Sequence, residues 1–234
     1  MNRASLQTTA VRTASAFAVA ALLLTSAFPS LAQDAGRIIF IGESNTPDQR
    51  IEILKTFGAS GPDHVAIISS ADTADELGLR MDGAWTSAVL TCGGGYGIEI
   101  RANAGDSAQS ALYTLPLLAA GVTDMTVDTA APEGVADGGS AALAGMFKTW
   151  GVIPCSQPDP DGTRRAFAQD GVKLAIELGQ SIDPEHPLQG ASKLAGVIIG
   201  TQGAQIASGN ADAAAIAEAV RAQASAAGFA LDDT

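Results

Sequence analysis

The feature that most constrains the fold is a recurring unit, in which a short apolar run ends in a polar loop and leads into a helix. Residues 37–45, Arg-Ile-Ile-Phe-Ile-Gly-Glu-Ser-Asn, precede Thr46 and Pro47, which suit the cap and the first turn of a helix. Residues 194–205 repeat this pattern, so Leu-Ala-Gly-Val-Ile-Ile-Gly is predicted to be a buried parallel strand. Strands that alternate with helices predict an α/β fold with a doubly wound, mainly parallel sheet and helices on both faces, a three-layer Rossmann or flavodoxin-like sandwich.

Glycine, proline and the spacing of apolar residues place the other elements. Further strands are expected at residues 64–70, where the run is apolar, at 96–101, where apolar and polar residues alternate as near a sheet edge, and at 124–128. Helices are expected within residues 74–92, 107–120, 139–150, 163–180 and 210–227, and Pro116 is expected to kink or end the second of these. The proline-rich residues 151–162 and the polar residues 181–192 are predicted to be connections.

Residues 1–32 have the composition of a secretory signal peptide. Arg3 and Arg12 form a basic start, an apolar stretch follows, and Ser30-Leu31-Ala32 fits a small-residue cleavage site. An uncleaved amino-terminal anchor is the alternative. We therefore expect an exported protein, periplasmic or secreted, with one α/β domain over residues 33–234 and no stable membrane insertion after cleavage.

The charge of the chain restricts its partners. Cleavage after Ala32 removes two arginines and no acid, which takes the formal charge from −12 to −14. Nucleic acid is not an expected partner, because its phosphates require a basic surface. A small polar or cationic molecule or a peptide is compatible with this acidity, and no motif calls for a cofactor or a metal ion. The sequence does not indicate an oligomeric state.

Cys92 and Cys155 are the two cysteines of the chain. An exported protein allows them to form a disulfide, and two buried free thiols are the alternative.

Ligands of open α/β sheets bind outside the carboxyl ends of the strands, so the loops after the predicted strands contain the candidate site. The ligand-binding candidates in these loops are Glu43, Asn45, Ser70, Asp72, Gln202 and Gln205. Ser44, at the end of the first strand, and Ser140, in Gly138-Gly139-Ser140-Ala141-Ala142, are the candidate nucleophiles. For Ser140 the alternative is a helix cap. Neither His64 nor His186 has a spacing that points to a serine.

Three segments resemble the cyanophycinase-like serine peptidases, which are relatives of class I glutamine amidotransferase domains. These segments are residues 37–42, residues 67–71 (Ile-Ile-Ser-Ser-Ala) and residues 194–200 followed by Gln205. The family has Gly-Gly-Asp-Gln after the last of these strands, and only Gly203 and Gln205 match it here. Its Gly-Thr-Ser-Ala-Gly nucleophile turn is not found before Thr234, so the resemblance implies a truncated or catalytically degenerate relative.

Two main hypotheses follow. The first is an exported serine hydrolase or peptidase of the cyanophycinase type, active or degenerate. The second is a periplasmic protein that binds a small polar or cationic ligand without catalysis. An exported α/β domain with a structural role, or one part of a longer product, is a third possibility.

Overall fold

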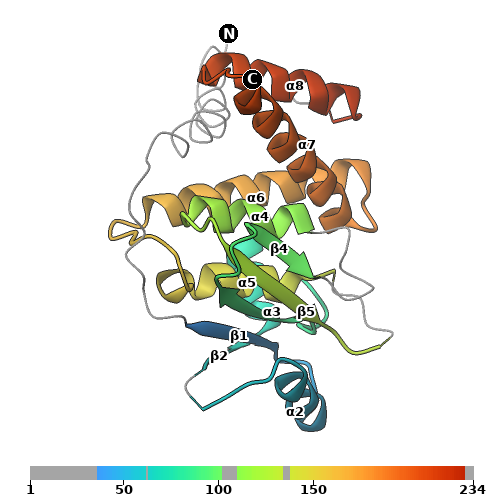
Figure 1. Ribbon diagram of the computed structural model, residues 1–234. Helices are drawn as coiled ribbons and strands as arrows, with labels where there is room; N and C mark the ends of the chain where they lie inside the picture. Colours follow the sequence, from blue (N-terminus) through green and yellow to red (C-terminus); the bar gives the residue numbers. More distant parts are fainter. Residues whose placement is uncertain (1–35, 62, 102–109, 134–137, 230–234) are drawn as a thin grey trace. The chain divides into compact units, whose positions relative to one another are not determined.

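The computed structural model describes residues 36–61, 63–101, 110–133 and 138–229 (Figure 1). The expected signal peptide, residues 1–32, lies outside the described residues. The strands are β1 (Arg37–Gly42), β2 (His64–Ile68), β3 (Ser87–Cys92), β4 (Ile98–Arg101) and β5 (Met125–Ala130). The helices are α2 (Pro47–Thr56), α3 (Ser70–Leu77), α4 (Ser110–Ala119), α5 (Ser140–Lys148), α6 (Thr163–Ile182), α7 (Pro187–Ala207) and α8 (Ala213–Ala226), with a 3₁₀ turn, η2, at Trp150–Val152.

The strands form one sheet in the order β2-β1-β3-β5-β4. β1 is parallel to β2 and β4 is parallel to β5, whereas β3 is antiparallel to both β1 and β5. Four of the five strands therefore run in one direction, as a mainly parallel sheet requires, and the central strand runs in the other. The predicted α/β fold is confirmed, with this one reversed strand added to it.

The alternating side chains of β1 make the contacts on both faces of the sheet. Ile39 and Ile41 belong to a buried cluster with Ile53 of α2 and Phe57, which caps the carboxyl end of that helix. On the opposite face, the ring of Phe40 lies directly against the backbone of α5 at Gly145. A glycine at this position lets the helix and the strand pack closely. Figure 1 shows α2 and α5 on different sides of β1. Helices thus cover both faces, as predicted.

Helix α5 is the centre of the fold, since every residue from Ser140 to Phe147 is buried. α5 packs against β1, β2 and β3, and α3 packs on α5, while α6 contacts both α3 and α4 (Figure 1). Arg165 of α6 joins these layers: Nη2 lies 2.6 Å from Oε2 of Glu76 in α3, and Nε donates to the carbonyl oxygen of Phe147 at 3.0 Å.

The local signals around α2 act as predicted. The Thr46 side chain accepts from the backbone N–H of Gln49, and the Gln49 side chain accepts from the N–H of Thr46, which completes a capping box. Pro47 occupies the first helical position, and Gly58 follows the helix end with a positive φ of 60°.

Other expectations are wrong. Residues 87–92, expected within a helix, form the central strand β3, because α3 is capped by Ser69 and already ends at Gly78 in the left-handed conformation. β2 was expected to be buried, but it lies at the edge of the sheet, and Val65 and Ile67 are 45% and 42% exposed. The predicted connection 181–192 is mostly helical, because α6 continues to Ile182 and α7 begins at Pro187.

The predicted strand at residues 194–200 is also wrong, since this segment lies inside α7. Buried positions along α7 include Leu188, Ala191, Ser192 and Ala195, whose i, i+3, i+4, i+7 spacing is that of one helix face. A short apolar run bounded by glycines does not by itself distinguish a strand from a buried helix, and here the longer periodicity decides.

The described chain divides into two compact units, one ending at Lys193 and the other beginning at Leu194, and α7 runs continuously through the division. The second unit contains the remainder of α7 and α8. Among the residues that the structure describes, no helix is both long enough and apolar enough to cross a bilayer.

Candidate functional site

The loops after the parallel strands β1, β2 and β5, which include loops that the sequence predicts to contain the site, leave the sheet at one edge, at the same end of the strands. The carboxyl ends of β1, β2, β4 and β5 lie at this edge, and the reversed β3 begins there. We call it the carboxyl edge. The loop after β1 is bonded to the start of β3, because the N–H of Gly42 donates to Oγ of Ser87 at 3.2 Å and the N–H of Ser44 donates to the carbonyl oxygen of Ala84 at 2.9 Å.

Asn45 is the buried polar residue of this edge, with 2% of its surface exposed. Its Nδ2 donates to the carbonyl oxygens of Gly42, at 2.9 Å, and of Trp85, at 2.7 Å. These two bonds fix the orientation of the amide, and they leave Oδ1 buried without a partner. A buried acceptor in this state costs about 1–3 kcal/mol, so Oδ1 is suited to receive a donor from water or from a ligand.

Ser44 and Glu43 precede Asn45 in the same loop. Oγ of Ser44 is half-buried and accepts from the N–H of Ala84 at 2.9 Å. Glu43 is exposed, and Arg50 of α2 folds back to donate to the carbonyl oxygens of Glu43 and Asn45. These bonds hold the loop backbone in place and leave the Glu43 carboxylate in solvent.

Ser70 and Asp72 lie beyond the carboxyl end of β2, at the first and third positions of α3. Asp72 forms a capping box with Ser69 and binds Nζ of Lys148 at 2.8 Å. Burial on its own would raise the pKa of the Asp72 carboxyl, but hydrogen bonds from Lys148 and Ser69 outweigh it, so this pKa lies below its ordinary value of 3.8. The carboxylate therefore serves as a helix cap and an ion-pair partner in this structure.

Ser140 is the first residue of α5, and the preceding Gly139, in the left-handed conformation, occupies the cap position instead. The expected alternative, Ser140 as the cap, is thus wrong by one residue. The Ser140 side chain has no exposed surface, and its Oγ is buried without a partner. Tyr113 of α4 donates its hydroxyl to the carbonyl oxygen of Gly139 at 3.1 Å, which fixes the entry to the helix.

Contrary to the prediction, Gln202 and Gln205 do not follow a strand. Both lie on α7, in the unit that begins at Leu194, because the strand predicted to carry their loop is helical. Oε1 of Gln205 accepts from Nδ2 of Asn210 at 2.8 Å. Gln205 also lines a shallow pocket of about 470 Å³ between α7 and α8, whose other lining residues are Gly200, Thr201, Ala204, Ala219, Ala222 and Gln223.

The two histidines are the first bases to consider for the candidate nucleophiles Ser44 and Ser140. His64 is exposed and is the first residue of β2, so it lies at the edge of the sheet opposite the carboxyl edge. Nδ1 of His186 lies 3.3 Å from Oδ1 of Asp183. In the described part of the chain, neither ring bonds to a serine. Nor do three or more His, Cys, Asp or Glu side chains of the described residues gather as metal ligands.

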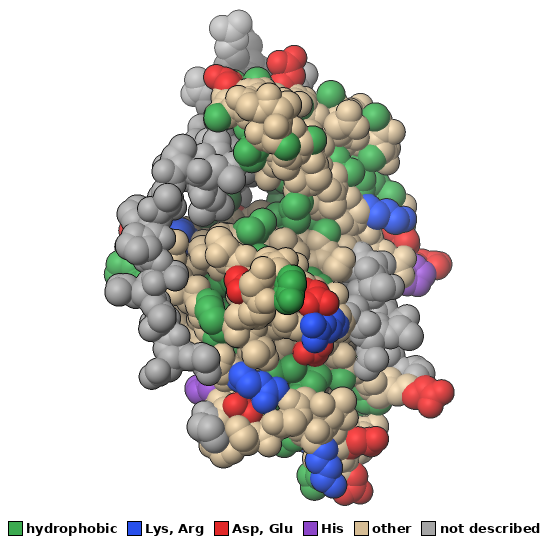
Figure 2. Space-filling view, in the orientation of Figure 1, with side chains coloured by type: hydrophobic (Ala, Val, Ile, Leu, Met, Phe, Trp, Pro, Cys, Tyr) green, Lys and Arg blue, Asp and Glu red, His purple; other side chains and the backbone are tan. Residues whose placement is uncertain are grey.

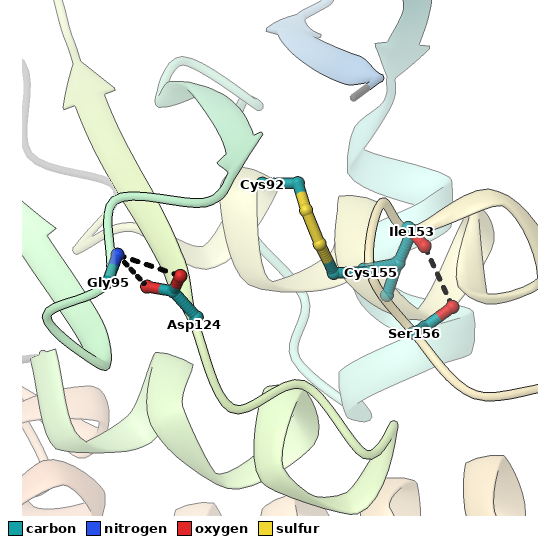
Figure 3. Close-up of a disulfide and its surroundings, with 6 residues drawn as sticks. All are labelled: Cys92, Gly95, Asp124, Ile153, Cys155 and Ser156. Atoms are coloured by element: carbon teal, nitrogen blue, oxygen red, sulfur yellow. Dashed lines mark hydrogen bonds between the residues drawn. A yellow bond between two sulfur atoms is a disulfide. The ribbon is translucent and has the colours of Figure 1, made fainter. Parts of the chain in front are cut away.

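At the edge opposite the carboxyl edge, Cys92 and Cys155 form a disulfide (Figure 3). Their Cα atoms are 5.7 Å apart, within the usual disulfide range, so the first of the two expected alternatives is confirmed. Beside this bond, the Asp124 carboxylate accepts from the N–H of Gly95 at 2.8 and 3.0 Å (Figure 3). The disulfide thus ties the end of β3 to the connection after α5.

Sequence reasoning missed Trp85 and Ser87 as members of the carboxyl edge. Their segment was assigned to a helix, so no loop was expected to enter the site there. The available signal was Gly78, which ends α3 and makes room for a strand in residues 87–92.

The surface gives one further observation. On the face shown in Figure 2, Lys and Arg side chains of the described residues are interspersed with Asp and Glu, and they form no continuous basic patch there.

Comparison with protein families matches residues 41–234 to the family described as "Protein of unknown function (DUF1002)". No curated protein and no solved structure matches the chain. The family match spans most of the 234 residues and includes both Asn45 and Ser140. The chain therefore belongs to the DUF1002 family.

Proposed function

We propose that this protein is an exported binding protein that holds a small polar ligand at the carboxyl edge of its sheet and does not convert it. The observation that carries the proposal is the pair of buried polar atoms without partners, Oδ1 of Asn45 and Oγ of Ser140. Asn45 follows β1 and Ser140 follows β5, two strands whose carboxyl ends lie at the same edge. Unpaired buried polar atoms are rare in folded proteins, and a ligand with its own donors and acceptors would satisfy them.

Three further observations support the proposal. The disulfide fits an oxidising compartment, in agreement with the signal-like composition of residues 1–32. Among the described residues, the two candidate serines lack the arrangement that hydrolysis requires: Ser140 is fully buried, and Oγ of Ser44 is bonded to a backbone N–H instead of a base. The acidic composition and the exposed Glu43 beside Asn45 favour a ligand that also carries a donor such as an ammonium or amide group.

A hydrolase of the cyanophycinase type is the second candidate, because Ser44 lies at the end of a buried strand and is partly accessible. Its support is reduced, since one of the three segments that carried the resemblance is part of α7.

The test begins with the purified protein and a fluorophosphonate probe, followed by intact mass. We expect no adduct, and an adduct on Ser44 that disappears in Ser44→Ala would overturn the binding proposal in favour of hydrolysis. Ligand-free protein, refolded from urea, is then screened by thermal shift against amino acids, dipeptides, polyamines and small carboxylic acids. A ligand at about 100 times its Kd is expected to stabilise the protein by about 2.7 kcal/mol, which is a rise in Tm of several degrees.

Amide hydrogen exchange of the protein, measured with and without the ligand identified in the screen, then locates the site. We expect protection in residues 42–46 and 84–87 and none in residues 92–97, which lie at the opposite edge and serve as the internal control. Absence of any stabilising compound, together with no small molecule released from natively purified protein, would refute the proposed function.

A further inference from the structure

The first turn of α5 is a buried set of hydrogen-bond donors. Ser140, Ala141 and Ala142 have no exposed surface. The first backbone hydrogen bond of the helix runs from the N–H of Leu143 to the carbonyl oxygen of Gly139 at 3.1 Å, so the N–H groups of residues 140–142 precede it. Within the described residues these three N–H groups have no acceptor, and Oγ of Ser140 has no partner either.

These groups have the polarity that an anion needs. The amino end of a helix carries about half a positive charge, and its free N–H groups point outward along the axis. The side chain of a first-turn residue is tilted toward the same end of the helix, which directs the Ser140 hydroxyl to this region. Low exposure to water strengthens each of these interactions. The unpaired hydroxyl is an observation independent of the helix end, and both favour an acceptor at the same place.

We propose that the first turn of α5 binds the carboxylate group of the ligand, an inference that rests on the proposed function and specifies its chemistry. A carboxylate is favoured over a phosphate because it brings one negative charge, about half of which the helix end offsets, whereas a phosphate brings up to two. The basic residue of α5, Lys148, lies in the last turn and is bound to Asp72, so it does not supply a second positive charge here. The subsite is covered in the ligand-free protein, so binding requires local opening and is expected to be slow.

The experiment is an NMR titration of ¹⁵N-labelled, ligand-free protein with sodium acetate, with sodium phosphate and sodium chloride at matched ionic strength as the other arms. Acetate is expected to shift the amide resonances of residues 140–142 and chloride is not. Ser140→Ala is expected to weaken acetate binding about tenfold or more, the effect of losing one hydrogen bond to a charged group. Ser156→Ala, whose hydroxyl donates to the carbonyl oxygen of Ile153 away from this turn, is the control and should bind as the wild type does.

Each outcome has a defined meaning. Shifts with phosphate and not with acetate would replace the carboxylate by a phosphate and overturn the assignment. No shift with either anion would remove the subsite, and the wild-type spectrum decides this even if Ser140→Ala fails to fold. If a ligand from the thermal-shift screen binds wild type and Ser140→Ala equally, only the subsite fails. If no compound binds the wild type at all, the proposed function fails.

Discussion

The unpaired hydroxyl of Ser140 makes a prediction about stability that needs no ligand. Ser140 and Ser87 are both fully buried, but Oγ of Ser87 accepts from the N–H of Gly42, whereas Oγ of Ser140 has no partner. A buried hydroxyl without a hydrogen bond costs about 1–3 kcal/mol. Ser140→Ala removes this cost and loses only the packing of one oxygen atom, so the ligand-free variant is expected to be as stable as the wild type or about 1 kcal/mol more stable.

Ser87→Ala is the matched comparison, with the opposite expected sign. It leaves the N–H of Gly42 buried without an acceptor, which should lower the free energy of unfolding by about 1–3 kcal/mol. Urea unfolding followed by tryptophan fluorescence measures both variants, because Trp85 and Trp150 are the only tryptophans and both lie in the unit that ends at Lys193. A difference of about 2 kcal/mol between the variants is about 1 M in urea midpoint at a slope of about 2 kcal/mol/M.

Equal destabilisation of the two serine variants would refute this reasoning. It would mean that the Ser140 hydroxyl has a partner in solution, and the argument for an unsatisfied site at α5 would lose its basis. The expected result, a ligand-free protein stabilised by a change that weakens binding, is a trade-off between stability and function.

Three further predictions use the same unfolding assay. Gly145→Ala should lower the free energy of unfolding by about 1–3 kcal/mol, because the added Cβ would lie 2.7 Å from the ring of Phe40 in β1. Gly171→Ala is the control, because its added Cβ would meet no atom within 4 Å, and it should raise the free energy of unfolding by about 0.5–1 kcal/mol. Equal effects of the two glycine substitutions would contradict the packing of α5 on Phe40. Replacing Cys92 and Cys155 by serine should lower the free energy of unfolding by about 4 kcal/mol in the chain-entropy model. An unchanged urea midpoint would mean that the disulfide between them does not restrict the unfolded chain. Because the folded pKa of Asp72 is lowered, its contribution is present above about pH 4 and is lost as the pH falls further. The stability difference between wild type and Asp72→Asn should therefore be constant between about pH 7 and about pH 5 and shrink toward pH 3, whereas a constant difference throughout would argue against the shift.

The sequence predicted best where local chemistry determines structure. Thr46, Pro47 and Gln49 form a cap whose bonds lie within four residues, so the start of α2 could be read without knowledge of the fold. The segments 87–92 and 194–200 were assigned wrongly because their secondary structure depends on packing. The first becomes a strand between β1 and β5, and the second is one part of a long helix whose buried positions repeat beyond the apolar run.

The candidate site was predicted in part for the same reason. Glu43, Ser44 and Asn45 follow a strand that was predicted correctly, so they lie at the carboxyl edge as expected. Gln202 and Gln205 depended on the strand that does not exist. That Asn45 Oδ1 and Ser140 Oγ are unpaired could not be predicted, because it depends on tertiary packing; the amide of Asn45, for example, is oriented by Trp85, 40 residues away in the chain.

The reversed central strand has a consequence for how the chain folds. β3 pairs with β1 in a register that joins Arg37 to Thr91, and with β5 in one that joins Cys92 to Met125. Among the described strands, no neighbouring pair is connected by a short hairpin, so the middle of the sheet forms only after long loops have closed, which slows folding. Cys92 is the last residue of β3, and the placement of this strand in the sheet holds its Cα 5.7 Å from that of Cys155. The rate at which free thiols disappear during oxidative refolding should therefore report the docking of the central strand.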